Sequence, residues 1–281
     1  MKTAIDPNLT RKGAADAAEK ICLTLKRYGA EVVFAPGCED LAKKTGTEAA
    51  SDDGFYADCD IVIAVGGDGS IIRTAKFAAR YGKPVLGVNA GNVAFMAGLE
   101  ANELEMLRAL ETGEYSVDSR MMLTVEIITN GEVVKTVNCL NDAVFARGAG
   151  IYLTEIAVDC DGVPVNTFRA DGIVFATPTG STAYCLAAGG PIAEPTLESI
   201  IFTPICSYSM SSRCIIFSEK RTLTVRPTSE KRPLFLSADG EDEIPIPFGS
   251  CVRISKCERY ADFIRIKNDE FWRVLQDKIE K

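Results

Sequence analysis

The stretch Ile61-Val62-Ile63-Ala64-Val65-Gly66-Gly67-Asp68-Gly69-Ser70 joins a short apolar run to the turn GGDGS. The run is rich in Ile and Val, as is typical of a strand that is buried on both faces of a parallel sheet. An amphipathic segment, 71–81, follows at once. The stretch therefore predicts a strand, a tight turn and a helix in succession, and the glycines allow the backbone to approach a ligand closely.

The turn GGDGS has the composition of a phosphate site. We expect Ser70 and the amides around it to open the following helix, where unpaired N–H groups and the helix dipole favour a phosphate. Asp68 adds a carboxylate, which suits a group that takes a proton from a hydroxyl beside a phosphate. The alternative is a structural turn in which Asp68 caps the helix, and the spacing alone leaves both interpretations open.

Strands and helices alternate on both sides of this stretch. A short strand ending near Asp6, a helix from about Arg11 to Tyr28 capped by Thr10, and a strand at 31–35 precede it. A strand at 84–88 follows it. This alternation predicts a doubly wound α/β domain with a parallel sheet, whose ligand sites lie beyond the carboxyl ends of the strands.

The pattern changes at about Val117, where short β-rich runs separated by turns replace the alternation. Such runs predict an antiparallel, sandwich-like β domain. Two separate strands at 251–255 and 262–267 and an amphipathic helix end the chain, and we expect this tail to return to the first domain. The predicted domains are residues 1–117 with 262–281, and residues 118–261.

Composition excludes several classes of function. The net charge is −8 and no basic block offsets it, which argues against nucleic acid as a partner. No stretch resembles a membrane span and the N-terminus lacks a signal-peptide core, so we expect a cytoplasmic protein without a membrane partner. The chain has ten cysteines, no CxxC pair and no histidine, so we predict no tightly bound metal site. Without histidine, Ser-His and Cys-His nucleophilic systems are excluded.

Three further segments carry residues that suit a nucleotide. Leu86–Gly91 is a second glycine-bearing strand exit, and Asn141-Asp142 offers donors and acceptors for an adenine edge and ribose hydroxyls. Each of these two is also a common structural turn. The third, FRADGIVFATPTGSTAY at 168–184, predicts a buried strand at 172–176, a turn dense in hydroxyls and a helix from Ser181 to about Ala188. Buried hydroxyls need partners, so this cluster favours a ligand.

Taken together, these segments resemble the NAD kinase family, whose members phosphorylate the 2′-hydroxyl of the adenosine ribose of NAD to give NADP. GGDGS is similar to the family's GGDG motif, Leu140-Asn141-Asp142 to its NE motif, and 169–192 to its glycine-rich motif. The resemblance implies an α/β domain, a β domain completed by a returning tail, and a homodimer or homotetramer. It also implies NAD as the acceptor, and ATP with Mg²⁺ as the donor.

The resemblance assigns roles by position. Asp68 would be the general base on the ribose hydroxyl. The phosphate-binding residues would be Gly66, Gly67, Gly69 and Ser70. The NAD-binding residues would be Gly67, Asp68, Gly69, Asn89, Phe95, Asn141, Asp142, Asp171, Ser181, Thr182, Ala183 and Tyr184. Several positions depart from the family pattern; among them, Asp142 replaces Glu, Asn92 stands where a basic residue is frequent, and Tyr208 stands where His is frequent.

Two other functions stay open at the level of the sequence. A lipid or sugar kinase shares the GGDG turn, but the stretch 169–192 argues against it. A non-catalytic dinucleotide-binding protein would keep the pocket and lose the donor site, and the altered positions 92–95 and 208 motivate that alternative. The retention of Asp68 argues against it. Formation of NADP from NAD, ATP and Mg²⁺ separates these alternatives.

Overall fold

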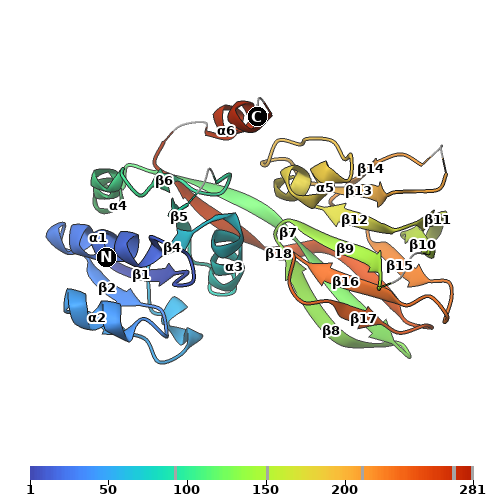
Figure 1. Cartoon of the computed structure of the whole chain (residues 1–281), viewed down its shortest axis with the longest axis horizontal. Helices are drawn as coiled ribbons and strands as arrows, with labels where there is room; N and C mark the ends of the chain where they lie inside the picture. Colours follow the sequence, from blue (N-terminus) through green and yellow to red (C-terminus); the bar gives the residue numbers. More distant parts are fainter. Residues whose placement is uncertain (92–93, 150–151, 210–211, 268–269, 280–281) are drawn as a thin grey trace. The chain divides into compact units, whose positions relative to one another are not determined.

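The computed structural model describes residues 1–91, 94–149, 152–209, 212–267 and 270–279 (Figure 1). It divides into two compact units, residues 1–119 with 261–281, and residues 120–260. Two long strands, β7 (Ser116–Thr129) and β18 (Cys251–Arg265), continue from one unit into the other. Within the described ranges, no helix combines the length and the apolarity that crossing a membrane requires.

The first unit is built on a parallel sheet with the strand order β3-β2-β1-β4-β5. The chain runs outward from β1 to β2 and β3, and then returns to the other side of β1 with β4 and β5. Every residue of β4 is buried, as its Ile- and Val-rich sequence predicts. The order reverses between β1 and β4, and in such sheets the carboxyl ends at the reversal bind ligands. The strands are β1 (Lys2–Pro7), β2 (Glu31–Phe34), β3 (Glu48–Ala49), β4 (Ile61–Gly66) and β5 (Val85–Asn89).

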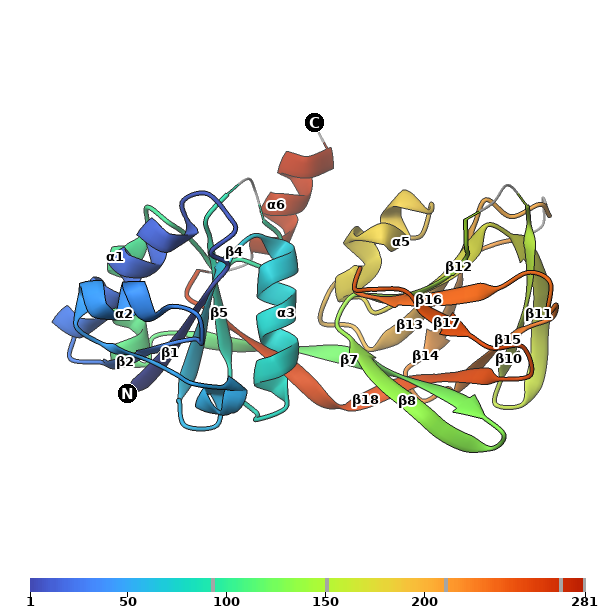
Figure 2. The same cartoon turned by 60° about the horizontal axis from the view of Figure 1, so that its bottom comes forward.

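The helices α1 (Ala14–Arg27) and α3 (Asp68–Ala79) lie on either side of this sheet (Figure 2). Right-handed crossovers that run in opposite directions along the sheet require this arrangement. The expected cap at Thr10 is wrong. The helix begins at Ala14 because Gly13 before it has a left-handed conformation with φ 86°, and Thr10 donates to Asn8 instead. The unit also contains α2 (Glu39–Thr45), η1 (Asp53–Tyr56), β6 (Leu99–Glu100), η2 (Leu104–Leu107) and α4 (Arg108–Thr112).

The second unit is antiparallel and β-rich, which confirms the predicted fold class. One sheet has the order β14-β13-β12-β9-β16-β17. The other contains β11, β10, β15, β18, β7 and β8. Both sheets contribute to one apolar core that includes Phe145, Phe175 and Phe202. The strands are β8 (Glu132–Cys139), β9 (Asp142–Arg147), β10 (Thr154–Cys160), β11 (Val163–Ala170), β12 (Gly172–Ala176), β13 (Ser199–Ile205), β14 (Ile215–Ser218), β15 (Leu223–Pro227), β16 (Leu234–Ala238) and β17 (Ile244–Ile246).

Two details of the sequence prediction are wrong. The expected strands at 251–255 and 262–267 are one continuous strand, β18, whose polar residues Glu258 and Arg259 are exposed on it and do not form a loop. Its last part joins the first unit, with Phe263 opposite Val85 of β5, and α6 (Glu270–Ile279) follows. The expected helix from Ser181 to Ala188 is divided into η3 (Thr179–Thr182) and α5 (Tyr184–Ala187), because Ala183 between them has non-helical φ −97° and ψ −131°.

Candidate phosphate and nucleotide sites

The GGDGS turn lies where β4 ends and α3 begins. Gly67 is extended and stands immediately before the helix, and Asp68 is the first helical residue. Gly66 is required by close packing, because a Cβ there would lie 2.7 Å from Ser70 Oγ. Gly69 is exposed, and a Cβ there would meet nothing within 4 Å. The turn therefore presents backbone at a helix N-terminus, where anions bind favourably.

Asp68 is held by a neighbouring strand exit. Its Oδ1 accepts a hydrogen bond of 2.9 Å from the Met96 N–H, in the segment that follows β5. The side chain is partly buried, and it stands inside the helix, one residue after Gly67 at the cap position. The interpretation of Asp68 as the helix cap is therefore wrong. A fixed carboxylate beside the first amides of α3 is geometry suited to a base.

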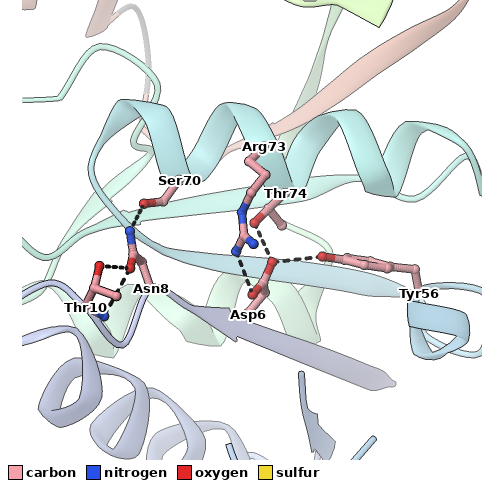
Figure 3. Close-up of polar contacts among 7 residues, drawn as sticks. All are labelled: Asp6, Asn8, Thr10, Tyr56, Ser70, Arg73 and Thr74. Atoms are coloured by element: carbon pink, nitrogen blue, oxygen red, sulfur yellow. Dashed lines mark hydrogen bonds and ion pairs between the residues drawn. The ribbon is translucent and has the colours of Figure 1, made fainter. Parts of the chain in front are cut away.

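Asn8 is a part of this turn that the sequence analysis missed. It follows β1, and its Nδ2 donates to Ser70 Oγ over 2.8 Å (Figure 3). Its Oδ1 accepts from the Thr10 N–H at 3.1 Å and from the Thr10 hydroxyl at 2.7 Å. These bonds join the exit of β1 to the exit of β4. The available signal was the position of Asn8 directly after a strand end at the carboxyl edge of a parallel sheet.

The exit of β5 carries Asn89 and Phe95. The Asn89 side chain is 2 % exposed, and its Nδ2 donates to Glu100 over 2.9 Å while its Oδ1 accepts from the Gly91 N–H over 3.1 Å. These bonds shape the segment after the strand. Phe95 is partly buried. The departure at Asn92 lies outside the described residues.

In the second unit, the Asn141-Asp142 turn is fastened by the carboxylate of Asp239. This carboxylate accepts hydrogen bonds from the N–H groups of Leu140 (2.8 Å), Asn141 (2.7 Å) and Asp142 (3.0 Å). Asp239 itself has a left-handed backbone with φ 51°, which Asp tolerates better than most residues. Asp239 has no role among the sequence-based predictions, and its local signal is the turn-forming pair Asp239-Gly240.

The same turn contacts the hydroxyl-rich segment that follows β12. The Thr177 N–H donates to the Asn141 carbonyl over 2.8 Å, and the Thr177 hydroxyl donates to the Leu140 carbonyl over 2.6 Å. Gly180 lies so near that a Cβ there would be 2.1 Å from the Asn141 carbonyl oxygen. Two motifs that are separated in the sequence therefore form one surface.

Asp142 is an unusual carboxyl group within this surface. It is 4 % exposed, and its pKa is raised to about 7. Burial is the largest cause, the nearby Asp239 carboxylate also raises the pKa, and a hydrogen bond from the Tyr184 backbone lowers it. Each of these causes acts on the free energy of the charged form. Asp142 therefore changes between a neutral and a charged group near neutral pH.

The other predicted NAD residues differ in their accessibility. The Ser181 hydroxyl is fully buried, accepts from the Ala193 N–H at 3.0 Å and donates to the Ala193 carbonyl at 3.2 Å. Ala183 and Thr182 are partly buried, and the Thr182 hydroxyl donates to the Thr179 carbonyl over 3.4 Å. The Tyr184 side chain is 49 % exposed. Tyr184 therefore offers a reachable ring, while Ser181 fastens the segment.

Asp171 stands at the junction of β11 and β12. Its Oδ1 accepts from Arg147 Nε over 2.7 Å, and both side chains are partly exposed. Tyr208 is 72 % exposed, and the Arg169 guanidinium carbon lies 5.3 Å from the centre of its ring. Among the residues that the structure describes, no cluster of three His, Cys, Asp or Glu side chains is arranged to hold a metal ion.

Comparison with known proteins identifies both halves of the chain. Residues 6–115 match the ATP-NAD kinase N-terminal domain, and residues 140–266 match the ATP-NAD kinase C-terminal domain. The NAD kinase of Caldanaerobacter subterraneus subsp. tengcongensis is 34 % identical over 281 residues, covering 99 % of this chain and 98 % of the relative. The NAD kinase of Symbiobacterium thermophilum is 35 % identical over 279 residues, with the same coverage.

Two solved structures have the same fold. The NAD kinase of Archaeoglobus fulgidus, solved in complex with ATP, is 27 % identical, has a TM-score of 0.76, and is matched over 100 % of this chain and 99 % of that one. The yeast NADH kinase, solved with NADH, has a TM-score of 0.89 at 21 % identity, over 100 % of this chain and 87 % of that one. The second likeness concerns the fold alone.

Proposed function

This chain belongs to the NAD kinase family, and from that premise we propose how its residues divide the reaction. The protein is an ATP-dependent kinase that phosphorylates NAD to form NADP. The single observation that carries this function is the match of both family domains in order along nearly the whole chain. The GGDGS turn and the Asn141-Asp142 surface then receive different tasks.

We assign the donor phosphates and the proton transfer to the first unit. A ribose hydroxyl is a poor nucleophile at neutral pH, so it needs a positioned base and neutralisation of charge on the transferred phosphoryl group. The chain has no histidine, and the carboxylate of Asp68 is oriented by the Met96 N–H beside the amides of α3. Asp68 is therefore the base, and the amides of Gly67 and Gly69 with the Ser70 hydroxyl contact phosphate.

We assign recognition of NAD to the second unit. Asn141 and Asp142 bind the adenosine, because amide and carboxyl groups form hydrogen bonds with the edge of the base and with ribose hydroxyls. Tyr184 supplies an exposed aromatic face for a ring, with Ala183 beside it, and Asp171 contacts the nicotinamide end. Ser181 and Thr182 support this surface through their bonds to Ala193 and Thr179.

Three properties that the family implies stay predictions. Mg²⁺ enters with ATP as part of the substrate and neutralises charge on the phosphates. A homodimer or homotetramer and a cytoplasmic location are expected in the same way.

The function is tested by incubating the purified protein with NAD, ATP and Mg²⁺ and measuring NADP with an NADP-specific dehydrogenase. We expect NADP to accumulate in proportion to ATP consumed. Tight NAD binding without any NADP would instead support the non-catalytic dinucleotide-binding protein. Phosphorylation of a lipid or sugar without NAD binding would support the remaining alternative.

A further inference from the structure

Two of the ten cysteines lie beside the segment that carries Tyr184. Cys185 is the second residue of α5 and is fully buried, and Cys214 stands directly before β14 and is partly buried. Both belong to the second unit, in which α5, β13 and β14 lie close together (Figure 1). Neither thiol has a role in the function proposed above.

The pairing of β13 with β14 places Cys214 opposite Thr203. Phe202 pairs with Ile215 in this antiparallel ladder, so the next pair in the same register is Thr203 with Cys214. Opposed side chains point to the same face of a sheet, with their Cβ atoms about 4.5–5.5 Å apart. The Cys185 Sγ lies 3.3 Å from the Thr203 hydroxyl oxygen. Both sulfurs are therefore on one face of the sheet, next to the same threonine.

The turn that follows α5 contacts both sulfurs as well. The Cys214 thiol donates to the Gly189 carbonyl over 3.5 Å. At Gly190, a Cβ would lie 2.3 Å from the Cys185 Sγ. The absence of a side chain at Gly190 therefore leaves room for sulfur between the turn and the sheet.

The two thiols differ in reactivity. Burial raises the pKa of the Cys185 thiol, and the charge of a nearby Cys214 thiolate also raises it. Because a thiolate attacks a disulfide far more readily than a thiol does, the buried and protonated Cys185 is a poor first nucleophile. Cys214 is partly exposed. Cys214 is therefore the thiol that reacts first, and Cys185 is the thiol that reacts second.

We propose that Cys185 and Cys214 form a reversible disulfide by exchange with a small-molecule disulfide, and that this bond weakens the binding of NAD. With oxidised glutathione, the Cys214 thiolate attacks one glutathione sulfur, forms a mixed disulfide and releases one glutathione thiolate. The Cys185 sulfur then attacks the Cys214 Sγ, and its proton passes to the second glutathione as that thiol leaves. The two protein thiols are oxidised to one disulfide, and one glutathione disulfide is reduced to two thiols.

The bond acts on NAD through Tyr184. Oxidation removes the Cys214 thiol proton, and with it the hydrogen bond to the Gly189 carbonyl. It also draws Cys185 toward Cys214 until the sulfurs are about 2.05 Å apart. Tyr184 directly precedes Cys185, and its backbone N–H donates to the Asp142 carboxylate. A shift of Tyr184 therefore changes two groups assigned to NAD, and this step rests on the proposed function, whereas the disulfide itself does not.

Peptide mapping tests the bond. Reduced full-length protein is incubated with oxidised glutathione, its remaining thiols are blocked with iodoacetamide, and it is digested with trypsin for mass spectrometry. Trypsin leaves Cys185 and Cys206 in the peptide 170–213, and Cys214 in the peptide 214–220. We expect these two peptides to be joined, and to separate on treatment with dithiothreitol.

Three serine variants identify the partners. Cys214→Ser and Cys185→Ser should each abolish the joined peptides. Cys206→Ser is the matched control, because Cys206 is exposed and shares the tryptic peptide of Cys185, and it should leave the joined peptides in place. Cys214→Ser changes a partly exposed side chain, so it also serves if the buried substitution at Cys185 impairs folding.

Calorimetric titration with NAD tests the consequence. The oxidised protein should bind NAD at least ~10-fold more weakly than the reduced protein, and dithiothreitol should restore the affinity. The KM for ATP should stay within about twofold. Cys214→Ser should bind NAD as the reduced wild-type protein does, both before and after incubation with oxidised glutathione.

The proposal fails if glutathione stays on Cys214 and no joined peptides form, or if Cys206→Ser removes them. Joined peptides with an unchanged affinity for NAD would overturn the effect on binding. If the reduced protein neither binds NAD nor forms NADP, the proposed function fails separately. The joined peptides then still decide whether Cys185 and Cys214 form the disulfide.

Discussion

The GGDGS turn of the first unit lies where strand β4 ends, and the Asn141-Asp142 turn of the second unit lies where strand β9 begins. The protein uses glycine differently at these two turns. At Gly69 a Cβ would meet nothing within 4 Å. At Gly180, which packs on the Asn141 turn, a Cβ would come within 2.1 Å of a backbone oxygen. The backbone at Gly69 is therefore open to a ligand, whereas the backbone at Gly180 is closed because the protein packs against itself.

The largest effect is expected from an alanine at Gly180, and an alanine at Gly69 is the comparison. Gly180→Ala should lower the free energy of unfolding by about 3 kcal/mol or more, because backbone atoms must move to admit the Cβ. Gly69→Ala should change it by less than about 1 kcal/mol and in the stabilising direction, because Gly69 is inside α3. Urea denaturation measures both. Similar losses in the two variants would remove the distinction between an open and a closed turn.

The next effect concerns the chemistry of the open turn. Asp68→Asn should reduce kcat at least ~100-fold with NAD binding retained, because the amide takes no proton from the ribose hydroxyl. Steady-state kinetics and calorimetric titration with NAD measure the two quantities. Asp58→Asn, at an exposed carboxylate of the same unit, is the matched control. Near-normal turnover in Asp68→Asn would exclude this residue as the base.

A smaller effect is expected from the carboxylate that fastens the closed turn. Asp239→Asn keeps the shape but removes the charge that three backbone N–H groups share. We expect it to cost about 2 kcal/mol in the free energy of unfolding and to raise the KM for NAD, because charged hydrogen bonds are replaced by neutral ones. Asp242→Asn, exposed nearby, should do neither. An unchanged KM for NAD would show that this turn takes no part in binding the acceptor.

A further effect is a dependence of the free energy of unfolding on pH that comes from Asp142. Its pKa is raised from 3.8 to about 7 in the folded protein, so the folded state binds more protons than the unfolded state between these values. The contribution of Asp142 to the free energy of unfolding is therefore fully present below pH 3.8 and is lost as the pH rises to about 7. The slope is at most about 1.4 kcal/mol per pH unit.

Asp142→Asn provides the comparison for this dependence. Between pH 5 and pH 7, the wild-type protein should lose stability relative to the variant, as measured by urea denaturation at each pH. Parallel behaviour of the two proteins would contradict a raised pKa at Asp142.

Much of the fold was predictable because its signals are local. The Ile- and Val-rich run before GGDGS predicts a strand buried on both faces, and β4 is one. The alternation of strands and helices before Val117 predicts an α/β half, and the β runs separated by turns after it predict an antiparallel half. The structure confirms both. Errors arose where local signals compete with packing. Thr10 resembles a helix cap, but Gly13 sets the start of α1, and the polar middle of β18 resembles a loop although its ends are paired.

The sequence by itself determined the types of the two units, the family, and the turn that carries Asp68, because strand periodicity, glycine turns and motif order are properties of neighbouring residues. Only the tertiary structure decided what holds these motifs. Asp239 reaches the Asp142 N–H across 97 positions, and Arg11 enters the space beside Gly67 and Gly91. Such contacts depend on where separate strand ends meet in space, and no local pattern encodes that meeting.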